Sequence, residues 1–213
     1  MIGIIDMETN NINCFIKILN KFNYKYKIIT KYNDYNDEIN KLIIPGIGNY
    51  NNCMNYLKNN DLDKVIFLHN NNNKKILGIC IGMQIFTEYG TEECYTMGLN
   101  ILQNTKTDLL NTKYILPNIG WNTIYTYDKN IDDDNFIKNI NLLCDFYFVH
   151  SYNIIFNNIK NYIENERYKI YYSQYYDIEF IALIKTDNLL LTQFHPEKSG
   201  INGINFIKNF LLW

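Results

Sequence analysis

The amino-acid sequence predicts an α/β fold: a mostly parallel central sheet with helices on both faces, plus antiparallel strand extensions in the second half. Two observations support this prediction. Over the first 90 residues, short apolar runs alternate with helix-like patterns, which is typical of a parallel sheet covered on both faces. After Gly90 the chain consists mainly of short strand-like runs with turn residues between them, which favours antiparallel pairing.

The first half begins with the apolar run Ile2 to Ile5, which stops at Asp6 and predicts a central parallel strand. Apolar residues at helical spacing then predict a helix from about Asn11 to Phe22. The elements expected next are a strand at 25–30, a polar connection at 33–40, a strand at 41–44, two short helices from Tyr50 to about His69 broken near 59–61, a strand at 76–79 and a helix from Ile81 to about Tyr89. We expect His69, beside an asparagine tract, to lie on the surface.

The second half contains mainly strand-like runs. They predict strands at 97–105, 120–127, 145–149, 161–165, 168–173, 178–185 and 189–194. A short helix is expected at 135–140 after the acidic loop 132–134, and a final helix at 201–212. Because no linker or repeat marks a boundary, we expect a single domain over residues 1–213.

Composition limits the classes of partner and cofactor. The chain has 213 residues, of which 47% are hydrophobic, enough for one core. A net charge of −2 gives no electrostatic reason to expect nucleic acid or an anionic membrane as partner. No apolar run approaches the roughly 20 residues of a membrane span, so we expect a cytoplasmic protein. Five irregularly spaced cysteines fit neither a disulfide framework nor a zinc pattern, and we expect no metal ion and no other cofactor.

Cys80 lies where an apolar strand pattern changes into a helical one. Gly78 and Gly82 flank it at i−2 and i+2, the spacing at which a sharp strand-to-helix turn lets a nucleophile stand clear. A thiol at a helix N-terminus also faces the positive end of the helix dipole, which favours the reactive thiolate. A buried cysteine in a glycine-rich turn would give the same short pattern.

Two further clusters supply the other groups that a cysteine nucleophile needs. Pro45-Gly-Ile-Gly48 follows a strand, where backbone N–H groups can face a ligand oxygen, although an ordinary strand-to-helix turn has the same sequence character. His195 and Glu197 follow the last strand, and residues i and i+2 of an extended chain point to the same side. A cysteine needs a histidine base and a group that fixes its tautomer. As in the α/β-hydrolase elbow families, the nucleophile comes early in the chain and the histidine follows the last strand, so the three clusters together predict a cysteine hydrolase site.

Six segments, spread over nearly the whole chain, carry a resemblance to a known family. They are Pro45-Gly-Ile-Gly48, Gly78 to Gln84, Gly98-Leu99, Leu116 to Asn122, Phe146 to Tyr152 and Gln193 to Gly200. The chain resembles the class I (triad) glutamine amidotransferases, and among them the glutaminase subunit of imidazole glycerol phosphate synthase. The elbow and His-Pro-Glu are typical of the class; Pro-x-x-Gly-Trp-Asn and Phe-Val-His-Ser-Tyr are typical of this subunit. The resemblance implies the flavodoxin-like sheet of that class.

The resemblance implies that the chain hydrolyses L-glutamine to glutamate and ammonia through a thioester on Cys80, with His195 and Glu197 completing the triad. The oxyanion hole that it implies consists of Gly46, Ile47, Gly48 and the N–H of Ile81. The glutamine-binding residues that it implies are Gly48, Gln84, Ser151 and Tyr152. We expect His150 to be a structural histidine near the pocket, with a second acid–base group as the alternative.

The resemblance also implies a partner. In this family a (β/α)8 barrel cyclase receives the ammonia, as in the histidine-biosynthesis enzyme imidazole glycerol phosphate synthase, and its binding activates the glutaminase. The expected assembly is therefore a heterodimer. Asn118, Trp121 and Lys198 match positions at or near that interface, although Trp121 would also suit a core aromatic.

Two departures from the family pattern concern the partner and leave the triad intact. Met7 to Asn11 replaces a glycine-containing turn after the first strand, and Asn118 stands where a histidine is common. Three alternatives therefore stay open: a paralogous amidotransferase subunit feeding an amino-sugar or surface-polysaccharide synthase, a free-standing γ-glutamyl cysteine hydrolase, and a catalytically silent interaction subunit. The hydrolase would work without a partner, whereas a silent subunit should have lost a triad residue.

Overall fold

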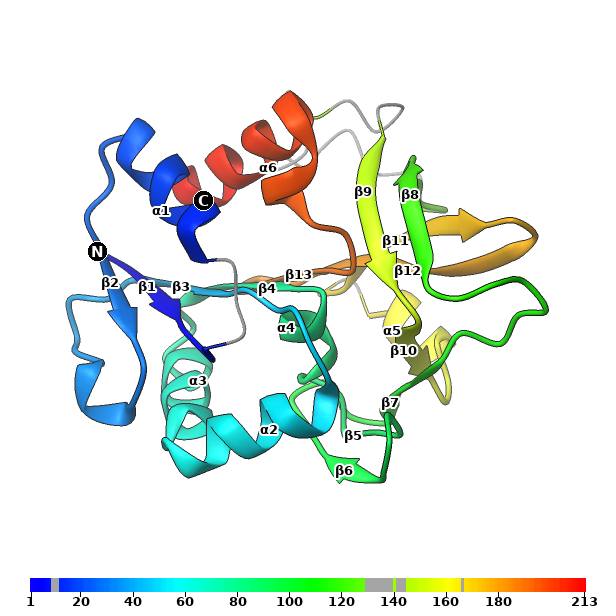
Figure 1. The fold of residues 1–213 in the computed structure, drawn as a ribbon, viewed down its shortest axis with the longest axis horizontal. Helices are drawn as coiled ribbons and strands as arrows, with labels where there is room; N and C mark the ends of the chain where they lie inside the picture. The colour runs from blue at the N-terminus through cyan, green and yellow to red at the C-terminus, as the bar shows by residue number, and fades with distance from the viewer. Residues whose placement is uncertain (9–11, 129–139, 141–144, 166) are drawn as a thin grey trace.

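The computed structural model describes residues 1–8, 12–128, 140, 145–165 and 167–213. A seven-stranded sheet crosses the middle of the molecule in the order β11-β12-β13-β4-β3-β1-β2. Figure 1 shows this sheet nearly edge-on, with α1 and α6 on one face and α2 and α3 on the other. The predicted fold class, an α/β fold with helices on both faces of the sheet, is confirmed.

Five neighbouring strands of this sheet are parallel. They are β1 (Ile2–Ile5), β2 (Tyr26–Ile29), β3 (Lys41–Ile44), β4 (Lys75–Ile79) and β13 (Leu189–Thr192). Every residue of β1 and β13 is buried, because helices cover both faces and leave no place for polar side chains. The carboxyl ends of β3, β4 and β13 meet at one edge of the sheet, which is where ligands bind in open α/β folds.

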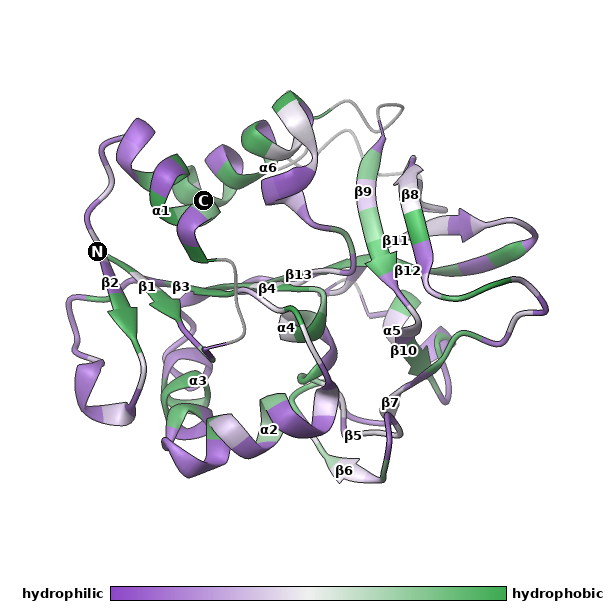
Figure 2. Ribbon diagram, in the orientation of Figure 1, coloured by the Kyte–Doolittle hydropathy of each residue, from purple (hydrophilic) through white to green (hydrophobic). Residues whose placement is uncertain are grey.

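Four longer helices pack on the sheet: α1 (Ile12–Lys21), α2 (Tyr50–Asn59), α3 (Leu62–Asn71) and α6 (Gly200–Leu212). Asn49 caps α2, since its side chain accepts hydrogen bonds from the N–H groups of Asn51 and Asn52. Figure 2 shows polar and apolar residues alternating along α2, as expected for a helix with one buried face. The predicted break between two helices is confirmed at Asp61, which has a left-handed backbone.

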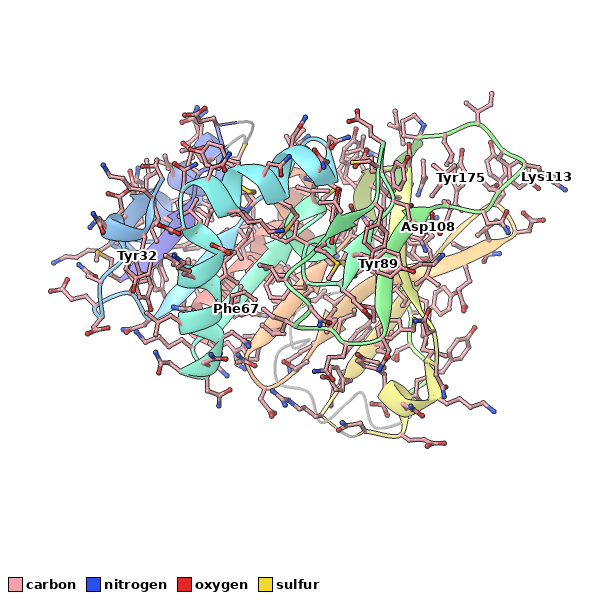
Figure 3. The ribbon with its side chains drawn as sticks, turned by 90° about the horizontal axis from the view of Figure 1, so that it is seen from below. Tyr32, Phe67, Tyr89, Asp108, Lys113 and Tyr175 are labelled. Atoms are coloured by element: carbon pink, nitrogen blue, oxygen red, sulfur yellow. The ribbon has the colours of Figure 1, made fainter. Side chains whose placement is uncertain are left out.

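The second half of the chain adds antiparallel strands, as predicted. β11 (Lys169–Tyr175) and β12 (Ile178–Lys185) extend the main sheet. A second sheet contains β10 (Tyr152–Phe156), β7 (Thr105–Leu109), β5 (Tyr89–Gly90) and β6 (Thr96–Met97), and a third pairs β8 (Asn118–Asn122) with β9 (Phe146–His150). Figure 3 shows Tyr89 and Asp108 close together on β5 and β7, and Lys113 near Tyr175 at one end of the molecule.

Two predicted elements are wrong. The helix expected from Ile81 to Tyr89 ends early, as α4 (Ile81–Gln84). The N–H of Glu88, which a continuing helix would direct to Gln84, donates instead to the carbonyl of Thr105 and leads the chain into β5. The strand expected at 161–165 is the helix α5 (Lys160–Ile163), because Ile159 and Tyr162, three residues apart, both pack against the core.

Several boundaries also differ from those predicted. The run 97–105 contains only the end of β6 and the start of β7, and the run 120–127 is replaced by β8, which starts and ends earlier. No strand was expected at β10. The helix predicted at 135–140 and its loop at 132–134 lie outside the described residues, apart from Ile140.

His69 is buried, so the prediction of a surface histidine is wrong. Its Nδ1 lies 2.9 Å from the hydroxyl of Tyr35, and its Nε2 lies 3.2 Å from the carbonyl oxygen of Lys75. Burial lowers the pKa of His69 to about 4. The buried imidazole is accommodated because Tyr35 and the carbonyl of Lys75, at the start of β4, provide partners for its two ring nitrogens.

The two faces of the sheet carry separate apolar cores. One lies between the sheet and α2 and α3, and the other lies between the sheet and α1 and α6. The short helix α4 packs at the carboxyl ends of β4 and β13, so Cys80 is fixed by the most buried part of the sheet. Within the described residues, no helix is long and apolar enough to cross a membrane.

Candidate active site

Cys80 forms the joint between β4 and α4 in a strained backbone conformation, with φ 53° and ψ −110°. A positive φ is costly for a residue with a side chain and usually marks a functional turn. A Cβ atom on Gly78 would collide with the carbonyl of Gly82, and one on Gly82 would collide with the carbonyl of Ile44. The two glycines are therefore required by close backbone approach, which is the reason that their spacing around the cysteine is informative.

Three groups from other segments surround the Cys80 elbow. The N–H of Cys80 donates to the carbonyl of Thr192 at 2.7 Å, which ties the turn to β13. The Cys80 sulfur lies 3.9 Å from the carbonyl oxygen of Val149 and 3.6 Å from Nε2 of Gln193. Cys80 is only partly buried, so one side of the sulfur stays accessible to a ligand.

His195 and Glu197 form a buried pair beside Cys80. Nδ1 of His195 lies 2.8 Å from Oε1 of Glu197, and only 2% and 4% of the two side chains is exposed. Burial alone would lower the pKa of His195, but charge attraction and hydrogen bonding to Cys80 and to Glu197 outweigh it and raise the pKa to about 10. Both neighbours therefore favour the charged form of the imidazole.

The local geometry of the His195–Glu197 contact differs from the extended chain that the spacing suggested. β13 ends at Thr192, and Pro196–Lys198 form a 3-10 turn that begins after His195. The N–H of Lys198 donates to the carbonyl of His195 at 3.0 Å. The turn, and not a strand, thus brings the carboxylate of Glu197 back to the imidazole.

Cys80 and His195 line a cavity of about 280 Å³ at the carboxyl edge of the sheet. The residues predicted for the oxyanion hole and for glutamine binding also line it: Gly46, Ile47, Gly48, Ile81, Gln84, Ser151 and Tyr152. Lys198, which was predicted at the partner interface, lines it as well. The lining residues that were not predicted as site residues are Glu92, Pro117, Val149 and His150. Glu197 lies behind His195 and does not line the cavity. Segments that are distant in the sequence are therefore brought together around one sulfur atom.

The turn at Gly46 to Gly48 packs directly on the start of α4. A Cβ atom on Gly46 would collide with the side chain of Ile81 and lie 2.5 Å from the backbone nitrogen of Gly82. Gly48 has φ 127°, a conformation that favours glycine. The first N–H groups of a helix have no partner within it, and both Ile81 and the turn at Gly46 to Gly48 line the cavity.

Gln84 sits one helical turn after Cys80 and is buried. Its Nε2 donates to the carbonyl oxygen of Tyr152 and to Oε1 of Gln193, both at 2.9 Å. Both amide hydrogens of Gln84 are thereby used, so its carbonyl oxygen is the part that remains for a ligand.

Glu92 is a pocket residue that the sequence reasoning missed. Its carboxylate accepts a hydrogen bond from the N–H of Tyr50 at 2.7 Å, at the start of α2. Burial raises the pKa of Glu92, and the hydrogen bond from Tyr50 partly opposes this. No local signal distinguishes Glu92 from Glu93 beside it in the sequence, because the contact joins two segments that are 42 residues apart.

His150 and Asn118 form a buried pair at the back of the cavity. Nδ1 of His150 lies 3.0 Å from the carbonyl oxygen of Tyr152, and Nε2 lies 3.0 Å from the amide nitrogen of Asn118. Because a carbonyl only accepts, Nδ1 carries the proton and Nε2 accepts. Burial lowers the pKa of His150 to about 4, and its role as a structural histidine stays a prediction.

Two of the predicted interface residues lie on the β8–β9 surface, and one does not reach it. The side chain of Trp121 is 54% exposed and packs edge-on against Tyr147, with ring centroids 5.6 Å apart. Nζ of Lys198 lies 5.7 Å from the centroid of the same tyrosine ring. Asn118 is buried against His150. Trp121 is therefore not a core aromatic, and the Asn118 side chain is not exposed on this surface.

Comparison with known proteins agrees with this geometry. Residues 3–213 match the family model of the class-I glutamine amidotransferases. Imidazole glycerol phosphate synthase subunit HisH 2 of Methanococcus maripaludis is 34% identical over 99% of this chain and 98% of its own length. Subunit HisH of Caldanaerobacter subterraneus is 36% identical over 99% of this chain and 97% of its own. A chain of PurLQS from Thermotoga maritima has the same fold, with a TM-score of 0.70 at 14% identity over 99% of this chain and 97% of that one.

Proposed function

The chain belongs to the class-I glutamine amidotransferases, and from this premise we propose that it is the glutaminase subunit of an imidazole glycerol phosphate synthase in histidine biosynthesis. The observation that carries the proposal is the accessible Cys80 sulfur beside the buried His195–Glu197 pair, in a chain that matches HisH subunits over nearly its full length. The match to HisH subunits favours this function over a subunit of an amino-sugar synthase and over a free-standing γ-glutamyl hydrolase, and the presence of all three triad residues argues against a silent subunit.

In the proposed reaction, the Cys80 thiolate attacks the side-chain amide carbon of L-glutamine. The carbonyl oxygen becomes negative, and the backbone of Gly46 to Gly48 with the N–H of Ile81 stabilises it, an effect worth a few kcal/mol per donor. His195 gives its proton to the amide nitrogen, which leaves as ammonia, and a thioester remains. His195 then removes a proton from water, which attacks the thioester, releases glutamate and restores the thiolate. Glu197 keeps the imidazole oriented throughout.

Substrate recognition follows from the other groups in the cavity. Glutamine carries an α-ammonium and an α-carboxylate in addition to its reacting amide. We assign the ammonium to the Glu92 carboxylate, since that carboxylate lines the cavity and, among the described residues, accepts a hydrogen bond through one oxygen, from the N–H of Tyr50. Gly48, Ser151, Tyr152 and the carbonyl oxygen of Gln84 complete the proposed substrate site.

A second subunit completes the proposed function, since the ammonia needs an acceptor. The relatives are named as subunits of a synthase, which supports the (β/α)8 barrel cyclase that the resemblance implies as the partner. We place its docking surface at the β8–β9 ribbon, where Ile119 and Trp121 are 60% and 54% exposed and Lys198 lies beside Tyr147. Docking there would act on Pro117 and Val149, which line the cavity, and through them on the oxyanion hole.

The test is glutamine-dependent ammonia release by the purified chain, alone and mixed with the cyclase subunit encoded in the same genome. We expect weak release alone and a strong increase with the partner. Cys80→Ala should abolish release in both cases, while replacing the exposed cysteine, Cys94→Ala, should not. Full activity without the partner would favour the γ-glutamyl hydrolase alternative, and ammonia release by Cys80→Ala would refute the thioester mechanism.

A further inference from the structure

Gln193 is a polar side chain beside the sulfur that the mechanism above does not use. It follows β13 directly and is completely buried. Its Nε2 lies 3.6 Å from the sulfur of Cys80, and its Oε1 lies 2.9 Å from Nε2 of Gln84. The N–H of Gln193 donates to the carbonyl of Ala182 at 2.9 Å, which fixes its backbone within the sheet. The nitrogen and the oxygen of the Gln193 amide therefore contact Cys80 and Gln84, and the backbone of Gln193 is fixed by its hydrogen bond to β12.

One backbone carbonyl determines which end of the Gln193 amide faces the sulfur. The carbonyl of Tyr152 can only accept a hydrogen bond, so Gln84 must present its NH₂ group to it. The second hydrogen of that NH₂ group goes to Gln193, which must therefore present its oxygen. The NH₂ group of Gln193 is left on the side of Cys80. The polarity of the whole chain of contacts thus places a donor against the sulfur.

We propose that Gln193 stabilises the thiolate form of Cys80 by donating an N–H hydrogen bond to its sulfur; the proposal rests on the function proposed above, in which Cys80 is the nucleophile. A buried donor favours an anionic sulfur strongly and a neutral thiol weakly, since a thiol is a poor acceptor. His195 stabilises the same sulfur through its positive charge, whereas Gln193 stabilises it through an N–H donor held in a fixed position. The bond weakens when the sulfur becomes a neutral thioester and forms again when water releases glutamate. Gln193 would therefore assist departure of the sulfur in the second step.

The test is the pH dependence of Cys80 alkylation by iodoacetamide, because only the thiolate reacts at an appreciable rate. The full chain is alkylated between pH 5 and 10, and the rate is measured by mass spectrometry after chymotryptic digestion. Cleavage at Phe86 separates the Cys80 peptide from Cys94. This readout needs neither glutamine nor a partner.

Gln193→Met replaces the amide by an apolar group of similar length. We expect its alkylation at pH 6.5 to be about tenfold slower than that of the unmodified chain, which corresponds to about 1.4 kcal/mol. At pH 10 the two rates should agree within about twofold, because a high pH favours the reactive thiolate whether or not the donor is present. Gln193→Glu, which places an acceptor against the sulfur, should slow the reaction further. Thr192→Val is the matched control: it removes a buried hydroxyl from the neighbouring position of β13 and should leave the profile unchanged.

A Gln193→Met profile that overlays that of the unmodified chain would refute the proposal, as would an equal slowing at every pH, which indicates lost access to the sulfur. If the methionine variant does not fold by circular dichroism, Gln193→Asn takes its place, since its shorter amide cannot reach the sulfur and the same shift is expected. Failure of the proposed function is seen separately, as absence of glutaminase activity in the unmodified chain with its partner.

Discussion

Replacing Glu197 by glutamine removes one negative charge from the buried pair with His195 and keeps the shape of the side chain. Oε1 of Glu197 lies 2.8 Å from Nδ1 of His195, whereas Oε2 is buried with no hydrogen-bond partner among the described residues. In Glu197→Gln the carbonyl oxygen can stay against Nδ1 while the NH₂ group takes the place of Oε2. The imidazole should then keep its orientation and tautomer and lose only the charge of its partner.

The size of the effect of Glu197→Gln follows from this geometry. A hydrogen bond to a charged group contributes about 1.5–3 kcal/mol and a neutral one about 0.5–1.5, so the change should cost about 1–2 kcal/mol. This corresponds to a decrease in kcat of roughly 5- to 30-fold. His195→Ala removes the proton transfer itself and should cost roughly 10²- to 10⁴-fold. Because Glu197 does not line the cavity, KM for glutamine should change by less than about twofold.

The assay is steady-state glutamine hydrolysis in the presence of the partner subunit, with kcat and KM determined separately for the unmodified chain, Glu197→Gln and His195→Ala. Circular dichroism and urea unfolding of each variant provide the control for folding. A loss in Glu197→Gln as large as that in His195→Ala would show that Glu197 does more than orient and charge the imidazole. An unchanged kcat would show that the buried carboxylate contributes nothing to turnover.

Four further predictions concern the pocket, the pH dependence, the surface and the elbow. Glu92→Gln should raise KM for glutamine by about tenfold or more with a smaller change in kcat, since it removes the proposed partner of the α-ammonium; an unchanged KM would contradict that assignment. The pKa of His195 is raised from 6.5 to about 10, so its contribution to stability is complete below pH 6.5 and is lost as the pH rises to 10; urea unfolding across this range should show the decline, and His195→Gln should flatten it. Trp121→Ala should reduce activation by the partner while changing the free energy of unfolding by less than about 0.5 kcal/mol, because the side chain is half exposed; loss of folding would show instead a structural role. Gly82→Ala should destabilise the protein by about 1–3 kcal/mol, since its Cβ atom meets the carbonyl of Ile44; thermal unfolding at an unchanged midpoint would refute the close approach.

Features that arise from interactions within a few residues could be predicted from the sequence. The glycines around Cys80 predicted the elbow, because a tight strand-to-helix turn excludes side chains at the positions two residues before and after the cysteine. The buried strands could be predicted from continuous apolar runs, because a sheet covered on both faces favours apolar residues throughout such strands. In both cases the steric requirement acts within a few residues, so the amino acids that satisfy it stand next to one another in the chain.

Features that depend on contacts between distant segments became visible only in the folded structure. Residues 160–163 form a helix, and not a strand, because Ile159 and Tyr162, which lie on the same face of a helical turn, both pack against the core. His69 is buried because Tyr35, 34 residues away, supplies its hydrogen bond. The carboxylate of Glu92 is bonded to the N–H of Tyr50, 42 residues away in the sequence. Gln193, which directly follows the adjacent strand β13, lies 113 residues from Cys80 along the chain. Such contacts leave no local pattern, because the residues near each partner in the sequence do not reveal which distant residue it will meet.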